Sequence, residues 1–100
     1  MSKLTKSARG EHCQVRIPDI CNFNPETTVL AHLNGGGAGM KHSDIHGAYC
    51  CSDCHDAIDG RAYRIATEDY VYNREDLKLM HLEGMVRTQI IMIEKGLIKI

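Results

Sequence analysis

Two cysteines and a histidine stand at metal-binding spacing in the middle of this sequence. The run Cys51-Ser-Asp-Cys54-His55 brings two thiols and an imidazole together in one short segment. Thiolate sulfur and imidazole nitrogen are ligands that zinc prefers in proteins. The same C-x-x-C-H string is also the attachment signal of a c-type haem, and a C-x-x-C pair can be a redox centre. The rest of the sequence has to decide between zinc, haem and redox chemistry.

Two further cysteines could complete a tetrahedral zinc site. Cys13 and Cys21 flank a stretch in which Pro18-Asp19 predicts a turn, so the chain can fold back and bring both thiols together. The seven residues between them exceed the usual spacing of two to four, but a short hairpin closes that gap. We therefore predict structural zinc on four cysteines: Cys13, Cys21, Cys51 and Cys54.

Other assignments of these side chains stay open at this point. The four cysteines could be buried and reduced without a metal. His55 could be the fourth zinc ligand beside three of the cysteines. Cys50 is the leftover thiol in the main prediction, and we expect it to pack as a small apolar side chain.

Length and composition favour zinc over haem. The chain has 100 residues, 43% of them hydrophobic and 25% charged, which is typical of a single small domain over residues 1–100. One Phe and no Trp leave little aromatic surface to bury, so a metal would add stability. The first residues contain no apolar secretion signal and no segment reads as a membrane span, so we expect a cytoplasmic protein. Five cysteines in a reducing compartment are more typical of metal ligands than of disulfides, and c-type haem is attached elsewhere.

The elements around these residues are predicted from their periodicity. Residues 27–33 are rich in β-branched side chains and predict a strand ending near His32. The glycine-rich run 34–39 then predicts a loop, and residues 45–50 a second strand that pairs with the first. Ser52 can cap a helix on which His55 and Asp59 lie one turn apart. Strand, loop, strand and helix over about residues 27–60 give the layout of a ββα-metal finger in a small α+β domain.

A resemblance to a known family supports this layout. From Ala8 to Ile100 the chain resembles the YbcO-type small phage and prophage proteins, a nuclease family grouped with the HNH endonucleases. The motifs that carry the resemblance are Ala8-Arg-Gly, Cys13-Gln-Val-Arg-Ile-Pro, Cys21-Asn, Asn24-Pro-Glu-Thr, Leu30-Ala-His32, Cys51-Ser-Asp-Cys54-His55-Asp56, Ile58-Asp59 and Leu82-Glu-Gly-Met85. The resemblance implies a zinc-stabilised HNH-like domain, encoded by a phage or prophage, that hydrolyses DNA.

The resemblance also implies roles for individual histidines. His32 matches the general base, and His55 matches the helix-borne ligand of a catalytic cation such as Mg²⁺ or Mn²⁺. The middle position of the motif falls near His46. HNH enzymes commonly carry a second cation ligand just before the base, where this chain has Ala31. Asp44, Asp59 and His42 are the candidates to replace it.

The prediction that the chain binds nucleic acid rests on its nuclease-like site residues more than on its net charge. The formal net charge of −1 argues against binding DNA by bulk electrostatics. Lys41, Arg61 and Arg64 lie on or beside the finger and could hold flanking phosphates. The rival function, made plausible by Ala31, is a non-catalytic zinc module that binds nucleic acid or a phage partner.

A helix over about residues 74–95 is the predicted scaffold. Apolar residues recur at helical spacing and form one stripe, which Gly96 ends: Leu79, Leu82, Val86, Ile90 and Ile93. We expect this amphipathic helix to cover the finger with that stripe. Met85, Ile91 and Met92 widen the apolar surface, so a homodimer through the same helix is a further expectation. His12 and His81 receive no role.

Overall fold

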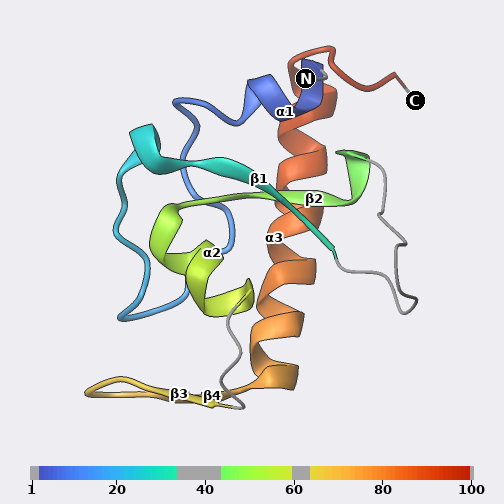
Figure 1. Ribbon diagram of the computed structural model, residues 1–100. Coiled ribbons are helices and arrows are strands. Elements are labelled where there is room, and N and C mark those ends of the chain that lie inside the picture. The colour runs from blue at the N-terminus through green and yellow to red at the C-terminus, as the bar shows by residue number, and fades with distance from the viewer. Residues whose placement is uncertain (1–2, 34–43, 60–63, 100) are drawn as a thin grey trace.

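A short antiparallel hairpin crosses one long helix at the centre of the molecule. The computed structural model describes residues 3–33, 44–59 and 64–99, which form a small α+β fold (Figure 1). Strand β1 (Val29–His32) pairs with β2 (Gly47–Cys50), helix α2 (Ser52–Asp59) follows β2 directly, and α3 (Arg74–Glu94) packs against β2. The remaining elements are α1 (Lys3–Ser7), the 3-10 turns η1 (Pro25–Thr27) and η2 (Asp44–His46), and the strands β3 (Arg64–Ala66) and β4 (Val71–Asn73).

Both predicted strands of the hairpin are present, with shorter bounds than expected. The two strands run antiparallel with His32 opposite Gly47, so the predicted histidine does stand at the end of the first strand. Thr27 belongs to η1 instead, because the Asn24 side chain accepts the Glu26 N–H and caps that turn. The second strand begins later for a similar reason, since Ile45 and His46 lie in η2.

Helix α2 begins where the sequence indicates, but a different residue caps it. The helix starts at Ser52, and its backbone N–H donates to Thr27 Oγ1 over 3.2 Å. The Cys54 N–H donates to Cys51 Sγ over 3.4 Å, so a cysteine takes the place that a capping hydroxyl usually fills. Cys54 and Ala57 are buried on this helix. The first turn of α2 is thereby tied to the cysteine core.

Helix α3 begins and ends close to the predicted bounds. Asn73 accepts the Asp76 N–H, and the Asp76 side chain accepts the Asn73 N–H, which is a reciprocal capping box. The helix ends at Glu94, and Gly96 follows with φ +74, a left-handed conformation that glycine adopts at little cost. The predicted scaffold helix is therefore present.

The predicted orientation of α3 is wrong. Three residues of the expected apolar stripe are exposed, Leu79 by 58% and both Val86 and Ile90 by 52%. The residues of α3 that are buried lie on the opposite side: Leu77, His81, Gly84, Thr88 and Met92. The apolar stripe does not cover the hairpin; the opposite face does, with Leu77 and Met92 at its ends and smaller or polar residues between them.

Close packing and hydrogen bonding explain why that face is buried. A Cβ on Gly84 would lie 2.9 Å from Val15 Cγ2 and 3.0 Å from Val15 Cα, so a larger residue would push the N-terminal loop away. The Thr88 hydroxyl accepts the Tyr49 N–H over 2.9 Å and donates to the Gly84 carbonyl over 2.7 Å. The Thr88 side chain therefore supplies a hydrogen-bond partner for the Tyr49 N–H of β2, which the pairing with β1 leaves without one.

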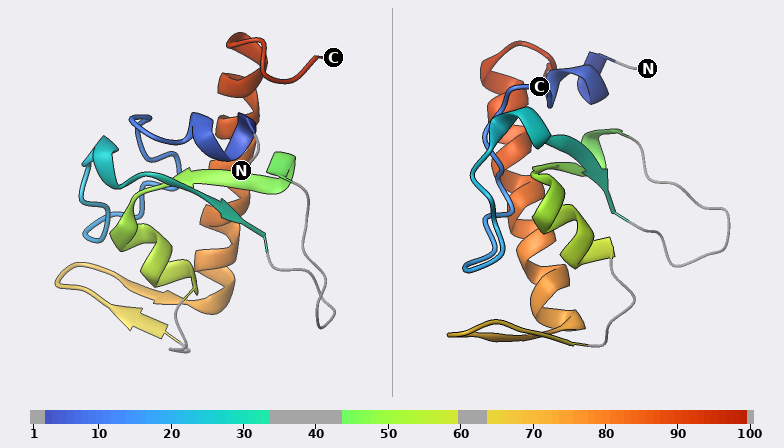
Figure 2. Two further views of the ribbon diagram at one scale, coloured as in Figure 1. Left: turned by 45° about the horizontal axis from the view of Figure 1, so that its top comes forward. Right: turned by 60° about the vertical axis from the view of Figure 1, so that its left-hand side comes forward.

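Two buried clusters form the interior. One contains Cys13, Cys51 and Cys54 together with Val15 and Ile17, and the other contains Ala8, Leu30, Tyr49 and Met92. Helix α1, which the sequence did not indicate, closes the second cluster, and Ser7 Oγ lies 2.7 Å from Tyr49 Oη. The β3–β4 hairpin, also not expected, projects from the N-terminal end of α3 (Figure 2). None of the helices in the described ranges is long and apolar enough to span a membrane.

Candidate functional site

Four cysteines from two segments meet in the first cluster. The sulfur atoms of Cys13, Cys21, Cys51 and Cys54 all lie within 4.8 Å of one another. Cys51 Sγ and Cys21 Sγ are 3.8 Å apart, and a tetrahedral zinc site with bonds of about 2.3 Å has sulfur atoms about 3.8 Å apart. The predicted grouping of these cysteines is confirmed. Its donor atoms and their spacing fit a structural zinc ion.

Backbone N–H groups point at each of these sulfur atoms. The Arg16 N–H donates to Cys13 and the Cys54 N–H donates to Cys51, both over 3.4 Å. The N–H groups of Phe23 and Ile17 donate to Cys21 and Cys54, respectively. Arg16 and Phe23 both have positive φ, 50 and 56, in the turns that follow Cys13 and Cys21. The N-terminal loop thus adopts an unfavourable backbone conformation twice where its N–H groups meet sulfur.

The hydrogen bonds among the thiols favour ionisation of Cys13 over ionisation of Cys54. Thiol donors on Cys50 and Cys54 hold the pKa of Cys13 well below its ordinary value. The pKa of Cys54 is raised, because this thiol donates to Cys13, and burial raises the pKa of Cys21 to about 11. Without a metal, one thiolate is therefore stabilised at the expense of its neighbours. A divalent cation would allow all four sulfur atoms to ionise together.

Cys50 lies in the first buried cluster and outside the group of four, as expected for the leftover thiol. It is fully buried, as expected, but its thiol donates to Cys13 and does not contact only apolar atoms. A thiol that donates to a metal-bound thiolate belongs to the layer of groups that orient the ligands. Cys50 therefore supports the cluster from β2 without being one of its four grouped sulfur atoms.

A second group of polar side chains lies at the far end of the hairpin. His32 Nε2 is 2.6 Å from Asp44 Oδ1, so the end of β1 is tied to η2. The two side chains are 37% and 30% exposed, which leaves them in contact with solvent. A carboxylate only accepts hydrogen bonds, so Nε2 carries the proton and Nδ1 of neutral His32 keeps its lone pair. Asp44 was predicted as a cation ligand, and its described contact is with the imidazole.

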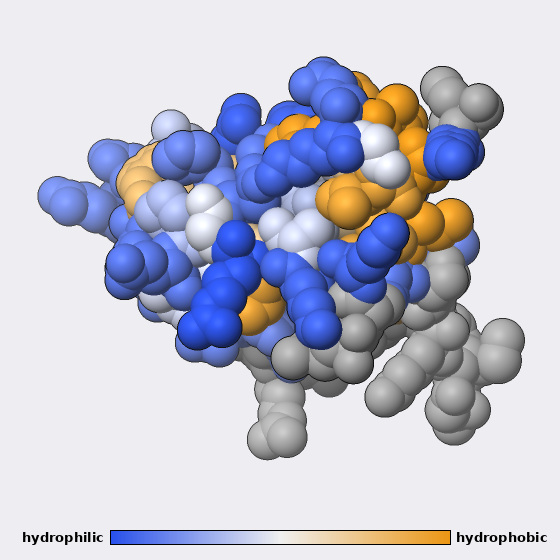
Figure 3. Space-filling model, turned by 90° about the horizontal axis from the view of Figure 1, so that it is seen from above, coloured by the Kyte–Doolittle hydropathy of each residue, from blue (hydrophilic) through white to orange (hydrophobic). Residues whose placement is uncertain are grey.

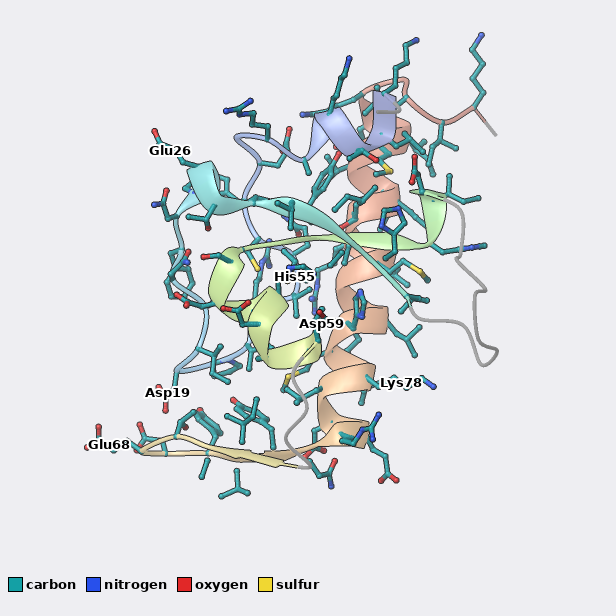
Figure 4. All side chains as sticks on the ribbon, in the orientation of Figure 1. Asp19, Glu26, His55, Asp59, Glu68 and Lys78 are labelled. Carbon is teal, nitrogen blue, oxygen red and sulfur yellow. The ribbon has the colours of Figure 1, made fainter. Side chains whose placement is uncertain are left out.

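The other predicted site residues come from η2 and α2. His46 is half-buried in η2, where its carbonyl accepts the Leu33 N–H over 2.9 Å. Figure 4 shows His55 and Asp59 one turn apart on α2, toward α3 in that view. Within the described ranges, the cysteines are the one group of three or more His, Cys, Asp or Glu ligands that lie this close together. A catalytic cation held by His55, Asp44 and Asp59 therefore stays a prediction.

His81 is a residue that the sequence reasoning missed. It is 8% exposed, and its Nε2 donates to the Ala31 carbonyl over 2.7 Å. Burial lowers the pKa of His81, and the neighbouring His55 and His32 lower it further. Three histidines from β1, α2 and α3 are thus near one another. No pattern in the sequence indicated this role, because His81 lies on the face of α3 opposite the apolar stripe.

The lowered pKa of His81 predicts a pH dependence of stability. The unfolded chain takes up a proton near the ordinary pKa of 6.5, whereas the folded chain resists protonation until lower pH. The contribution of neutral His81 is therefore complete above that value and is lost as the pH falls below it. We expect His81→Gln, which keeps a donor for Ala31, to lose less stability between about pH 7.5 and 5.5 than the wild type.

Urea unfolding at both pH values, with bound zinc measured in each sample, checks this expectation. His12→Gln is the matched control and should keep the pH dependence of the wild type. Equal losses of stability in the wild type and in His81→Gln would show that His81 does not carry the effect.

The predicted nucleic-acid contacts are only partly described. Lys41, Arg61 and also His42 lie outside the described residues, and Arg64 is described only as the first backbone position of β3. The described hairpin that follows carries acidic residues at its tip, where Asp19 accepts the Thr67 hydroxyl and the Asp69 N–H. Figure 4 shows Asp19 and Glu68 close to this end of the molecule. The tip is thus an unfavourable surface for phosphates.

Known proteins resemble the chain over nearly its whole length. A family profile described as "Putative nuclease YbcO" matches residues 2–97. Proteins of that description in Escherichia coli K12 and in Enterobacteria phage 82 are each 47% identical over 102 residues, covering 99% of both chains. A solved structure of "a putative bacteriophage protein" from Escherichia coli K-12 has a TM-score of 0.73 and 44% identity, and covers 93% of this chain and 99% of that one.

Proposed function

The chain belongs to the YbcO family, and from this premise we propose that it is a cation-dependent DNA endonuclease of the HNH type. The relatives' description, "Putative nuclease YbcO", supports a nuclease function and a nucleic-acid substrate. The HNH mechanism, the DNA substrate and the catalytic residues are our own proposal. The observation that carries it is the His32–Asp44 pair at the end of β1, together with His55 on α2, which like His32 lies near His81.

The proposed base is His32, and Asp44 prepares it for that role. Nδ1 of the neutral ring takes a proton from water, whose oxygen attacks phosphorus while the bond to the leaving oxygen breaks. The leaving oxygen takes a proton from solvent. The Asp44 carboxylate holds the ring in the correct tautomer and stabilises the imidazolium that forms.

A divalent cation would supply charge neutralisation at the phosphate and the leaving oxygen. His55 and Asp59 are the residues that would hold it, from adjacent turns of α2. Mg²⁺ commonly takes only one or two protein ligands and completes its shell with water and substrate phosphates. An incomplete set of protein ligands is therefore compatible with the proposal. His46, in the turn that carries Asp44, is proposed to position the base.

A non-catalytic zinc module is the second candidate. One observation favours it: Ala31 precedes His32, and the described residues contain no second close group of three cation ligands. In that case the cysteine cluster would hold the fold, and the exposed histidines would only contact nucleic acid or a protein partner.

Plasmid cleavage separates the two candidates. Protein that has been treated with a chelator but still contains zinc is incubated with supercoiled plasmid and added Mg²⁺, Mn²⁺ or Ni²⁺. We expect nicked circles to accumulate only when a cation is added, with the zinc content of the protein unchanged. If folded, zinc-loaded protein leaves the plasmid intact with all three ions, the binding module becomes the better assignment.

A further inference from the structure

His81 ties α3 to the strand that carries the proposed base. Its Nε2 donates to the Ala31 carbonyl over 2.7 Å, and Ala31 directly precedes His32 in β1. The imidazole is only 8% exposed, and burial of a polar side chain is costly unless it forms hydrogen bonds. The Ala31 carbonyl cannot move away without breaking this buried hydrogen bond, so the backbone next to His32 is held in place.

Gln89 ties the same helix to the turn that carries the carboxylate. Its Nε2 donates to the Ile45 carbonyl over 2.5 Å, and Ile45 directly follows Asp44 in η2. His32 and Asp44 come from two separate segments, and His32 Nε2 lies 2.6 Å from Asp44 Oδ1. Both members of the pair are thus joined to α3 through a neighbouring backbone carbonyl.

The helix keeps the two anchoring side chains at a fixed spacing. His81 and Gln89 are eight residues apart in the interior of α3 (Arg74–Glu94), which corresponds to about 12 Å along the helix axis. The helix also bonds to β2 between them, since the Thr88 hydroxyl accepts the Tyr49 N–H. One rigid helix, which crosses both strands in Figure 1, therefore sets how β1, β2 and η2 lie relative to one another.

A small displacement of a catalytic group has a large effect on rate. A shift of about 1 Å, caused by a substitution away from the chemistry, can lower a rate about a hundredfold. The two bonds differ in exposure, because the His81 bond is buried and the Gln89 bond is exposed to solvent. Figure 3 views the end of the molecule where α1, which contacts η2, and the last turn of α3 lie, and hydrophilic side chains make up much of this surface. Water can replace a lost donor at such a surface, so we expect loss of the Gln89 bond to have the smaller effect.

We propose that His81 and Gln89 are positioning residues of the endonuclease, which hold His32 and Asp44 in the geometry that proton transfer needs. Neither side chain contacts the reacting atoms, and both act through the backbone of β1 and η2. This role rests on the proposed function, in which His32 is the base and Asp44 orients it. It extends the site to the scaffold helix, outside the ββα finger.

Rates of plasmid nicking by zinc-loaded variants test this role. His81→Leu removes the donor with little change of volume, and we expect kcat to fall about thirtyfold to a hundredfold while KM for the plasmid stays within about twofold. His81→Gln keeps a donor near the position of Nε2 and should restore kcat to within about fivefold of the wild type. Gln89→Met should lower kcat about fivefold. Thr88→Val is the matched control, because it removes another hydrogen bond between α3 and the hairpin and should keep the wild-type kcat.

A second background separates positioning from a general loss of structure. If His81 acts through His32, His81→Leu should cause no further loss of rate in the His32→Ala variant, because the two residues then act as one unit. A further loss there, an equal loss in Thr88→Val, or no rescue by His81→Gln would overturn the proposal. Gln89→Met alters a half-buried side chain and decides the outcome by the same double-variant criterion if His81→Leu does not fold.

The ring of His32 reports the same geometry independently of activity. Nitrogen-15 chemical shifts of labelled protein at one pH show whether Nε2 keeps its proton toward Asp44. We expect wild-type shifts in His81→Gln and Thr88→Val, and altered shifts in His81→Leu and Gln89→Met. A wild type that nicks no plasmid with any cation would reject the nuclease function, and the ring shifts would then decide alone whether α3 positions the pair. Wild-type shifts in both His81→Leu and Gln89→Met would show that it does not.

Discussion

Removal of zinc from the four-cysteine cluster is expected to unfold the protein. The cluster ties Cys13 and Cys21 of the N-terminal loop to Cys51 and Cys54 at the start of α2. Three of these cysteines are also members of the first buried cluster, so loss of the metal opens the core itself. Binding of structural zinc is worth about 10–16 kcal/mol in small zinc domains, which equals or exceeds the total stability of a typical domain. We therefore expect a strong chelator to abolish the cooperative thermal transition.

Single substitutions show whether the bound metal or the packing of the thiols holds the fold together. Cys54→Ser removes one ligand and is expected to lower zinc content and to prevent folding at ordinary temperature. Cys50→Ala removes a buried thiol that is outside the group of four, so the variant should keep its zinc and lose only about 1–2 kcal/mol of stability. Zinc content by elemental analysis and unfolding by circular dichroism are the measurements. A chelated protein that keeps its transition would show that packing alone holds the fold.

The same measurements distinguish the alternative in which His55 is a zinc ligand. His55→Ala leaves the four grouped sulfur atoms untouched, so we expect zinc content to stay at the wild-type level. If zinc were instead lost in His55→Ala and retained in one cysteine variant, the ligand set would be three cysteines and a histidine.

The sequence was sufficient to predict the features that depend on residues close together in the chain. Spacing and turn residues predicted which four cysteines come together, because Pro18-Asp19 reverses the chain between Cys13 and Cys21. Asp19 does take a left-handed conformation in that turn, with φ 66. The start of α3 was predictable for the same reason, since Asn73 and Asp76 form a capping box within one turn of helix. Each of these features depends on residues a few positions apart.

The sequence was insufficient where the outcome depends on packing. Periodicity identified an apolar stripe on α3, but it could not tell which side of the helix is buried. That choice follows from the fit of Gly84 against Val15 and from the Thr88 hydrogen bond to Tyr49, which join distant parts of the chain. The His81 contact with Ala31 spans a similar separation in sequence. Such contacts leave no pattern in a single sequence.

His32→Ala is expected to lower the rate of plasmid nicking by about a hundredfold to ten-thousandfold, the usual contribution of a general base. The side chain is 37% exposed at the end of β1, and its described hydrogen bond is to Asp44, so the fold and the zinc content should not change. The initial rate of nicking at saturating Mn²⁺ or Mg²⁺ is the measurement. His12→Ala, which removes a histidine away from the site, is the control and should cleave at the wild-type rate. Equal rates for His32→Ala and the wild type would remove His32 as the base.

Asp44→Asn tests the second half of the pair. The amide can still contact His32 but cannot stabilise an imidazolium as a carboxylate does, and it can hold the ring in the wrong tautomer. We expect a rate about tenfold to a hundredfold below the wild type, a smaller loss than in His32→Ala. If Asp44 acts only through His32, the double variant should be no slower than His32→Ala alone, because the two residues then act as one unit. A further loss in the double variant would mean that Asp44 has a separate role, and a cation ligand at Asp44, as the sequence first suggested, would become the better assignment.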